Sequence, residues 1–154
     1  MFRNLLPRLF GESDPASDPL SADDAELAVA ALLVRIARAD RHYGAPERRR
    51  IDSILARRRG LDPATTTDRR AAAEMLEAEA PDTVRFTRAI KDRIPLDQRI
   101  GVISGMWDVA LADGDRSPEE DAAIRLAAGL LGVSDQDSAR ARQSVARANA
   151  AAQG

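Results

Sequence analysis

The chain has 154 residues, of which 44% are hydrophobic and only 3% are aromatic, and its formal net charge is -2. This length suits one domain with a substantial core, and the small net charge predicts no overall attraction to nucleic acid or membranes. The absence of cysteine excludes disulfides, thiolate catalysis and cysteine-ligated zinc. A core of Ala, Leu, Ile and Val, which are mostly helix formers, predicts an all-α, single-domain bundle of about seven helices.

Residues 1–20 are expected to form a flexible N-terminal tail and linker. Residues 1–10 combine Phe and Leu with two arginines, but the stretch is too short for a signal peptide. It could lie on a membrane surface, although we favour a tail without a function of its own. Residues 11–20 are rich in Ser, Asp, Pro and Gly, which is typical of a linker. A cytoplasmic location is the default expectation, because no apolar run reaches the roughly 20 residues of a membrane span.

The folded domain is predicted to span residues 21–148, with residues 149–154 as a frayed C-terminus. The first helix begins at Ser21, a favourable capping residue, and is apolar on nearly every side, so we place it at the centre of the bundle. Pro46 opens the second helix. Gly60 ends it, because glycine accepts the left-handed conformation that a helix end often needs.

Five further helices are predicted from their capping residues and prolines. The third begins at Pro63, the fourth at Pro81, and the sixth at Pro118. The fifth spans residues 97–112, and Ser134 caps the seventh. The fifth helix is again apolar almost all round, but three small residues leave one side narrow enough for another backbone to approach. These are Gly101, Ser104 and Gly105.

An internal repeat is indicated by the two strongly apolar helices, since each is followed by a short acidic loop and an amphipathic helix. Asp40 and Asp113 each follow a helix, where a carboxylate faces the negative end of the helix dipole at a cost of about 0.3–1 kcal/mol. Glu47 and Glu120 lie in the first turn of the next helix, so each turn is expected to bring an Asp and a Glu together. Paired carboxylates suit a hard divalent cation such as Ca²⁺ or Mg²⁺. The alternative is purely local: Asx-turns for the aspartates and capping boxes for the glutamates.

Residues 32–51 (LLVRIARADRHYGAPERRRI) and 109–124 (VALADGDRSPEEDAAI) resemble the Ala-Asp-Gly…Glu signature of TerB-like proteins, the tellurite-resistance TerB superfamily. With helix order and repeat included, the likeness covers residues 22–146. It implies an all-helical domain with acidic residues that chelate a divalent metal, and a link to stress responses at the inner membrane face. The first copy departs from the signature, because Arg41 replaces the glycine. By position, the resemblance assigns the metal to Asp40, Glu47, Asp113 and Glu120.

Enzymatic motifs are missing from the sequence. His42 is the only histidine, and one histidine without cysteine cannot build a zinc site. No serine lies in a nucleophile elbow, and no glycine-rich phosphate loop is present. The leading expectation is therefore a non-enzymatic accessory domain.

Charge is distributed in blocks. Residues 12–26 hold six acids and no base, whereas the second helix concentrates arginine; such blocks can pair within the fold or recruit different partners. The arginines could form a solvated face, or a surface for lipid head groups or an acidic partner such as the chain's own N-terminal tail. Specific nucleic-acid binding is not expected, because aromatic residues are not interleaved with the charges. The six candidate arginines are Arg48, Arg49, Arg50, Arg57, Arg58 and Arg59.

Overall fold

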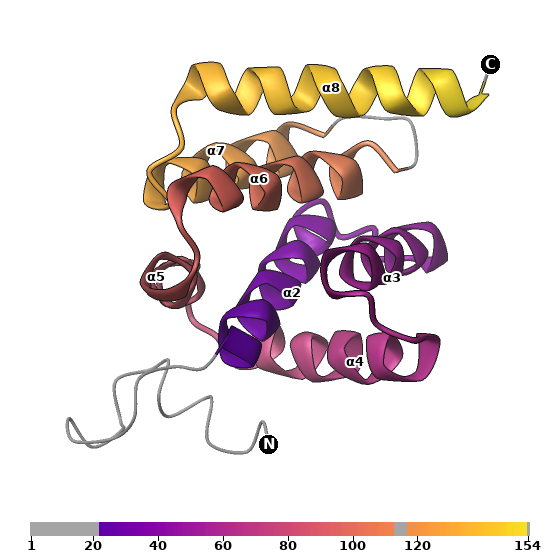
Figure 1. Cartoon of the computed structure of the whole chain (residues 1–154), viewed down its shortest axis with the longest axis vertical. Coiled ribbons are helices and arrows are strands. Elements are labelled where there is room, and N and C mark those ends of the chain that lie inside the picture. Colours follow the sequence, from indigo (N-terminus) through magenta and orange to yellow (C-terminus); the bar gives the residue numbers. More distant parts are fainter. Residues whose placement is uncertain (1–21, 113–116, 154) are drawn as a thin grey trace.

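The computed structural model describes residues 22–112 and 117–153, and this part of the chain consists of helices joined by turns and short connections (Figure 1). The predicted N-terminal tail and Asp113 lie outside the described residues. The all-α class and the predicted order of the helices are confirmed. The helices are α2 (Ala22–Arg38), α3 (Ala45–Arg59), α4 (Pro63–Glu79), α5 (Val84–Arg93), α6 (Leu96–Ala110), α7 (Pro118–Leu130) and α8 (Asp135–Gln153).

α2 crosses the middle of the bundle, as its all-round apolar sequence predicts. Every residue from 24 to 34 is buried, and the helix contacts α3, α4, α5, α6 and α7. In Figure 1, α4 lies below α2 and the α6–α7 pair lies above it. Large side chains such as Leu32 and Leu33 are fully buried, and each such burial stabilises the fold by about 1.5–3 kcal/mol.

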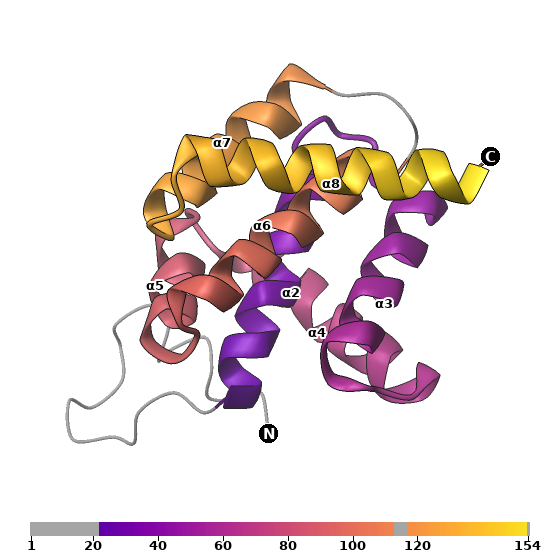
Figure 2. The same cartoon turned by 45° about the horizontal axis from the view of Figure 1, so that its top comes forward.

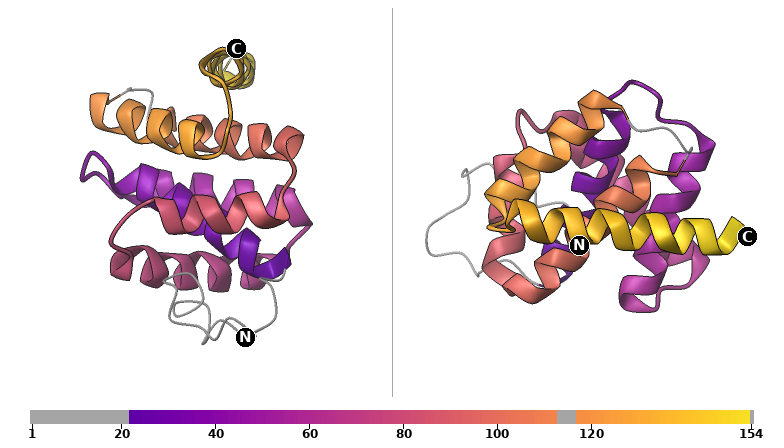
Figure 3. Two further views of the ribbon diagram at one scale, coloured as in Figure 1. Left: turned by 90° about the vertical axis from the view of Figure 1, so that its left-hand side faces the viewer. Right: turned by 90° about the horizontal axis from the view of Figure 1, so that it is seen from above.

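α8 covers the opposite end of the bundle from α4 and lies across α6 and α7 (Figures 1, 2 and 3). Trp107 of α6 holds it, because the indole Nε1 donates a buried hydrogen bond to Ser138 Oγ at 3.1 Å. The Arg142 guanidinium lies 5.7 Å from the centre of the Trp107 ring. α8 continues to Gln153, past residue 148, where the sequence predicts the domain to end.

The two halves of the predicted repeat have matching positions in the fold. Glu47 and Glu120 occupy the third helical position of α3 and α7, and both are buried. Ile51 and Ile124, one turn further on, are fully buried. Each unit therefore consists of an apolar helix, a loop and a helix that buries the same two side chains.

Helix ends differ from the prediction by a few residues. α5 begins at Val84 rather than Pro81, because the Asp82 carboxylate accepts the Val84 N–H at 3.1 Å and forms a turn before the helix. α6 spans Leu96–Ala110 instead of residues 97–112. None of the helices in the described part of the chain has both the length and the apolar character to cross a membrane.

The narrow side predicted for α6 is confirmed at one of its glycines. A Cβ atom on Gly105 would lie 3.4 Å from Ile54 Cγ2 and 3.6 Å from Leu33 Cδ2, so α3 and α2 approach closely there. A Cβ atom on Gly101 would meet no atom within 4 Å. Gly101 instead faces a pocket, which is described below.

Candidate functional site

The first acidic loop, between α2 and α3, is shaped by Asp40. Its Oδ1 accepts the His42 backbone N–H at 2.9 Å, and its Oδ2 lies 3.8 Å from His42 Nδ1. Arg41 between them has a φ of 68°, a left-handed conformation that costs a residue other than glycine about 1–2 kcal/mol. Asp40 thus adopts the Asx-turn that the sequence left open as its local role.

The two glutamates lie at equivalent helix starts. Glu47 is 6% exposed, and its Oε2 accepts the backbone N–H of Gly44 at 3.0 Å. Glu120 is 3% exposed; its N–H donates to Ser117 Oγ at 2.9 Å, and Ser117 Oγ donates to Glu120 Oε1 at 3.1 Å. Both carboxylates therefore take part in capping interactions, which was the local alternative for them.

Of the four residues predicted to bind a cation, the structure describes Asp40, Glu47 and Glu120. Among the described residues, no three Asp, Glu, His or Cys side chains are grouped so that they could hold a metal ion. Asp113 does not belong to the described residues, so the pairing of Asp113 with Glu120 stays a prediction.

Tyr43 joins the first loop to α4, and sequence reasoning did not identify this cluster. Its hydroxyl donates to Glu74 Oε2, and Arg70 pairs with both Glu74 at 3.2 Å and Asp52 at 2.6 Å. Burial of the phenol, together with the hydrogen bond to Glu74, raises the pKa of Tyr43 above its ordinary value of 10.0. Two guanidinium groups lie over the ring, those of Arg38 at 5.0 Å and Arg48 at 5.7 Å.

The C-terminal end of α3 pairs with the beginning of α2. Arg58 donates two hydrogen bonds to the Glu26 carboxylate, both at 2.9 Å, and Arg59 lies 3.9 Å from Asp23. Because Glu26 is nearly fully buried, its bidentate contact with Arg58 compensates the loss of water around the carboxylate. These predicted anion-binding arginines thus neutralise acids of the same chain.

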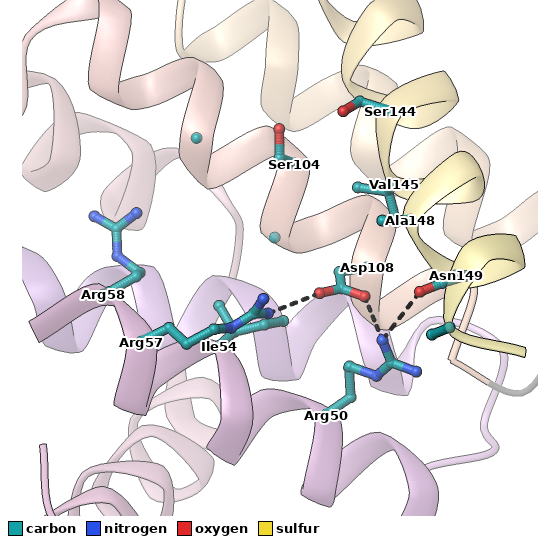
Figure 4. Close-up of a pocket in the computed structure, with 13 residues that line it drawn as sticks. Arg50, Ile54, Arg57, Arg58, Ser104, Asp108, Ser144, Val145, Ala148 and Asn149 are labelled. Carbon is teal, nitrogen blue, oxygen red and sulfur yellow. Dashed lines mark hydrogen bonds and ion pairs between the residues drawn. The ribbon is translucent and has the colours of Figure 1, made fainter. Parts of the chain in front are cut away.

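Two further arginines of α3 share one carboxylate on α6 (Figure 4). Asp108 accepts from Arg50 at 2.6 Å and from Arg57 at 3.1 Å. Arg50 also reaches Asn149 Oδ1 of α8 at 3.4 Å. Arg49, by contrast, is exposed to solvent. The six arginines therefore do not act as one uniform surface.

Comparison with known protein families identifies the family to which this helical domain belongs. A family model described as "Tellurite resistance protein TerB" matches residues 26–143. The chain belongs to the TerB family. The match extends from α2 into α8 and includes both acidic loops and all of α3, so the resemblance seen in the two Ala-Asp repeats is confirmed for this TerB domain. No curated protein and no solved structure matches the chain.

A pocket of about 620 Å³ opens between α3, α6 and α8 of the TerB domain. The side chains of Arg50, Arg57 and Arg58 lie along one wall, and Asp108 stands between α3 and α8 (Figure 4). Gly101 lies on the α6 side. Three guanidinium groups here meet the carboxylates of Asp108 and Glu26, which leaves an excess of positive charge at the pocket.

Proposed function

We propose that this chain is a non-catalytic binding domain of the TerB family, and that its second acidic loop binds a divalent cation such as Ca²⁺ or Mg²⁺ through Asp113 and Glu120. The observation that supports this is a buried carboxylate in the first turn of α7, directly after the loop. Glu120 is 3% exposed, and its neighbours Glu119 and Asp121 are also acidic. Carboxylate oxygens such as those of Asp113 and Glu120 are the ligands that a hard cation prefers.

The first loop offers a weaker version of the same site. Asp40 and Glu47 correspond by repeat to Asp113 and Glu120, but the Asp40 carboxylate already accepts a backbone N–H, and the next residue in the chain is Arg41. A positive charge next to the carboxylate reduces its attraction for a cation. We therefore expect this pair to add less to binding than the second loop.

Calorimetric titration of the full chain with Ca²⁺, Mg²⁺ and Zn²⁺ tests the proposal. We expect heat with Ca²⁺ or Mg²⁺ that is lost in Asp113→Asn and in Glu120→Gln, because each variant removes one charged oxygen ligand while keeping the shape of the side chain. Zn²⁺ is expected to bind no better, since the sequence has no cysteine and one histidine.

Glu119→Gln is the matched control for this titration, because Glu119 is exposed in the same helical turn. It removes the same charge without removing a proposed ligand, so it should leave most of the heat. Absence of heat in the intact chain, or equal loss in Glu119→Gln and Glu120→Gln, would contradict the cation site.

A second candidate function is docking to an acidic protein or to the anionic inner face of the cytoplasmic membrane. It is favoured by the exposure of Arg49 and by the Arg57 side chain, which is 67% exposed although it touches Asp108. Co-sedimentation with anionic vesicles at low and high salt tests the membrane form, because binding led by charge must weaken as salt rises. A chain that stays in solution at low salt contradicts it.

A further inference from the structure

The acidic block of residues 12–26 is only partly accounted for by the fold. Its last part begins α2, and there Asp23 and Glu26 contact Arg59 and Arg58 at the end of α3. The acidic block and the arginine helix therefore already meet at one point. The acids that precede this point along the chain are Glu12, Asp14 and Asp18.

The pocket between α3, α6 and α8 continues from this meeting point. Arg58 lines the pocket and also holds Glu26, so one end of the pocket lies beside the first turns of α2. Along the wall follow Arg57 and then Arg50, which have one carboxylate, Asp108, between them (Figure 4).

Arg57 has hydrogen-bonding capacity left for a ligand. A guanidinium group has five N–H donors. Of those on Arg57, Nε points to Ser53 O at 3.4 Å and Nη2 to Asp108 at 3.1 Å. Its side chain is 67% exposed, so a further carboxylate can reach it from solvent at little cost in desolvation.

We propose that residues 11–20 of this chain bind in the pocket between α3, α6 and α8, with carboxylates of Glu12, Asp14 or Asp18 contacting Arg57 and Arg50. This interaction is separate from the cation site and would make the N-terminal segment an internal competitor for any external acidic partner of the arginines. The segment itself lies outside the described residues, and the proposal rests on the pocket, its charge and the point where the chain enters α2.

Length and attachment favour this segment over a free ligand. An extended chain spans at most about 3.3–3.6 Å per residue, so the ten residues of the segment can reach well past the roughly 12 Å of helix that separates Arg58 from Arg50 on α3. A short tether gives an effective concentration on the order of millimolar, which populates contacts that would be too weak between separate molecules. Small and proline side chains of the segment, such as Pro15 and Ala16, suit a pocket whose apolar residues include Val145 and Ala148.

Paramagnetic relaxation in the full chain tests the proposal directly. Because the sequence has no cysteine, Ser13→Cys places a single nitroxide label between Glu12 and Asp14. In isotope-labelled protein, we expect strong broadening of amide signals around Arg57 and Val145, and weak broadening around Met75 on α4, at the opposite end of the bundle from α8 (Figure 1).

Three variants separate a specific site from general attraction. Arg57→Gln should remove most of the broadening on α8, because it deletes the exposed donor. Gly101→Leu should do the same without any change of charge, since an added side chain there meets open pocket and no atom within 4 Å of its Cβ. Arg49→Gln changes the same charge on the same helix outside the pocket and should leave the broadening unchanged.

The proposal is overturned if α8 shows no broadening in the spin-labelled Ser13→Cys protein that carries no further substitution. It is also overturned if Arg49→Gln and Arg57→Gln reduce the broadening equally. A mixture of spin-labelled chain with isotope-labelled chain that carries no spin label tests whether a second copy of the chain occupies the pocket. Broadening of the same signals in that mixture, at the strength seen within one chain, would mean that a second copy and not the chain's own segment fills the pocket.

Discussion

Tyr43 is the only tyrosine of the chain, and its surroundings oppose loss of the phenolic proton. Burial, the hydrogen bond to Glu74 and the negative charge of that carboxylate all raise its pKa, and they outweigh the nearby Arg70. The tyrosinate absorbance band of the native protein should therefore titrate well above pH 10, whereas in denaturant it should titrate near 10.0, the ordinary value. Coincident native and denatured titrations would contradict the cluster.

The same pKa shift links this residue to stability at alkaline pH. The folded pKa is raised, so above pH 10 the native state binds the proton more tightly than the unfolded state does. Stability from this source is present below pH 10 and is lost as the pH rises from there toward the raised value. Tyr43→Phe keeps an aromatic ring near Arg38 and Arg48 and should flatten this part of the stability curve.

The backbone conformation of Arg41 explains why the family signature has a glycine at this position. Its left-handed φ of 68° is the conformation that glycine adopts without steric cost. The sequence alone identified Arg41 as the departure from the signature, but not the backbone conformation that makes glycine favourable there. The Asx-turn of Asp40 and the capping of Glu47 could be predicted as local alternatives because both depend on residues within a few positions. A cation beside Asp40 and Glu47 would in addition need ligands from residues distant in the sequence, which local spacing does not predict.

At the scale of helices, Arg35 of α2 supports the end of α4. Its Nη2 donates to the carbonyl oxygens of Ala80 at 2.9 Å and Glu77 at 3.4 Å, and its Nε pairs with the Glu77 carboxylate at 3.1 Å. The carbonyl of Glu77 also accepts the Ala80 N–H at 3.2 Å, whereas that of Ala80 lies just past the end of the helix, where carbonyls have no intrahelical partner. The guanidinium also lies 5.4 Å from the centre of the Phe86 ring on α5.

Arg35→Met should therefore destabilise the protein by about 1.5–3 kcal/mol, the usual range for hydrogen bonds that involve a charged group. Methionine preserves much of the aliphatic contact while it removes the donors. Urea unfolding measures the difference, with Arg49→Met as the exposed control. A loss within about 0.5 kcal/mol, which is ordinary for surface positions, would show that the end of α4 does not depend on Arg35.

Most helices could be predicted from the sequence because their start and stop signals are local. The Asp62 and Ser117 side chains accept backbone N–H groups directly before the predicted starts at Pro63 and Pro118, and Gly60 ends α3 with a φ of 63°, as predicted. The pocket could not be predicted in this way, since it depends on how α8 projects past α6 toward α3. Asp108 belongs to the helix predicted over residues 97–112, and its pairing with two arginines of α3 depends on how the helices pack rather than on local spacing.

For the molecule as a whole, Trp107 reports whether α8 belongs to the same cooperative unit as α2. It is the only tryptophan, and it is buried where α6 meets α8. If the domain unfolds in one step, tryptophan fluorescence and far-ultraviolet circular dichroism should give the same urea midpoint. A fluorescence transition at lower urea, with most helix signal retained, would mean that α8 detaches first.

The central position of α2 also affects how the chain is made. Among the described helices α2 is synthesised first, but its apolar surface is covered in part by α6 and α7, which emerge from the ribosome later. At about 5–20 residues per second, the interval between completion of α2 and of α6 lasts on the order of 4–14 seconds. During that interval the apolar surface of α2 lacks the helices that later cover it. Slower translation would lengthen the interval, and it should therefore increase the need of the nascent chain for chaperones.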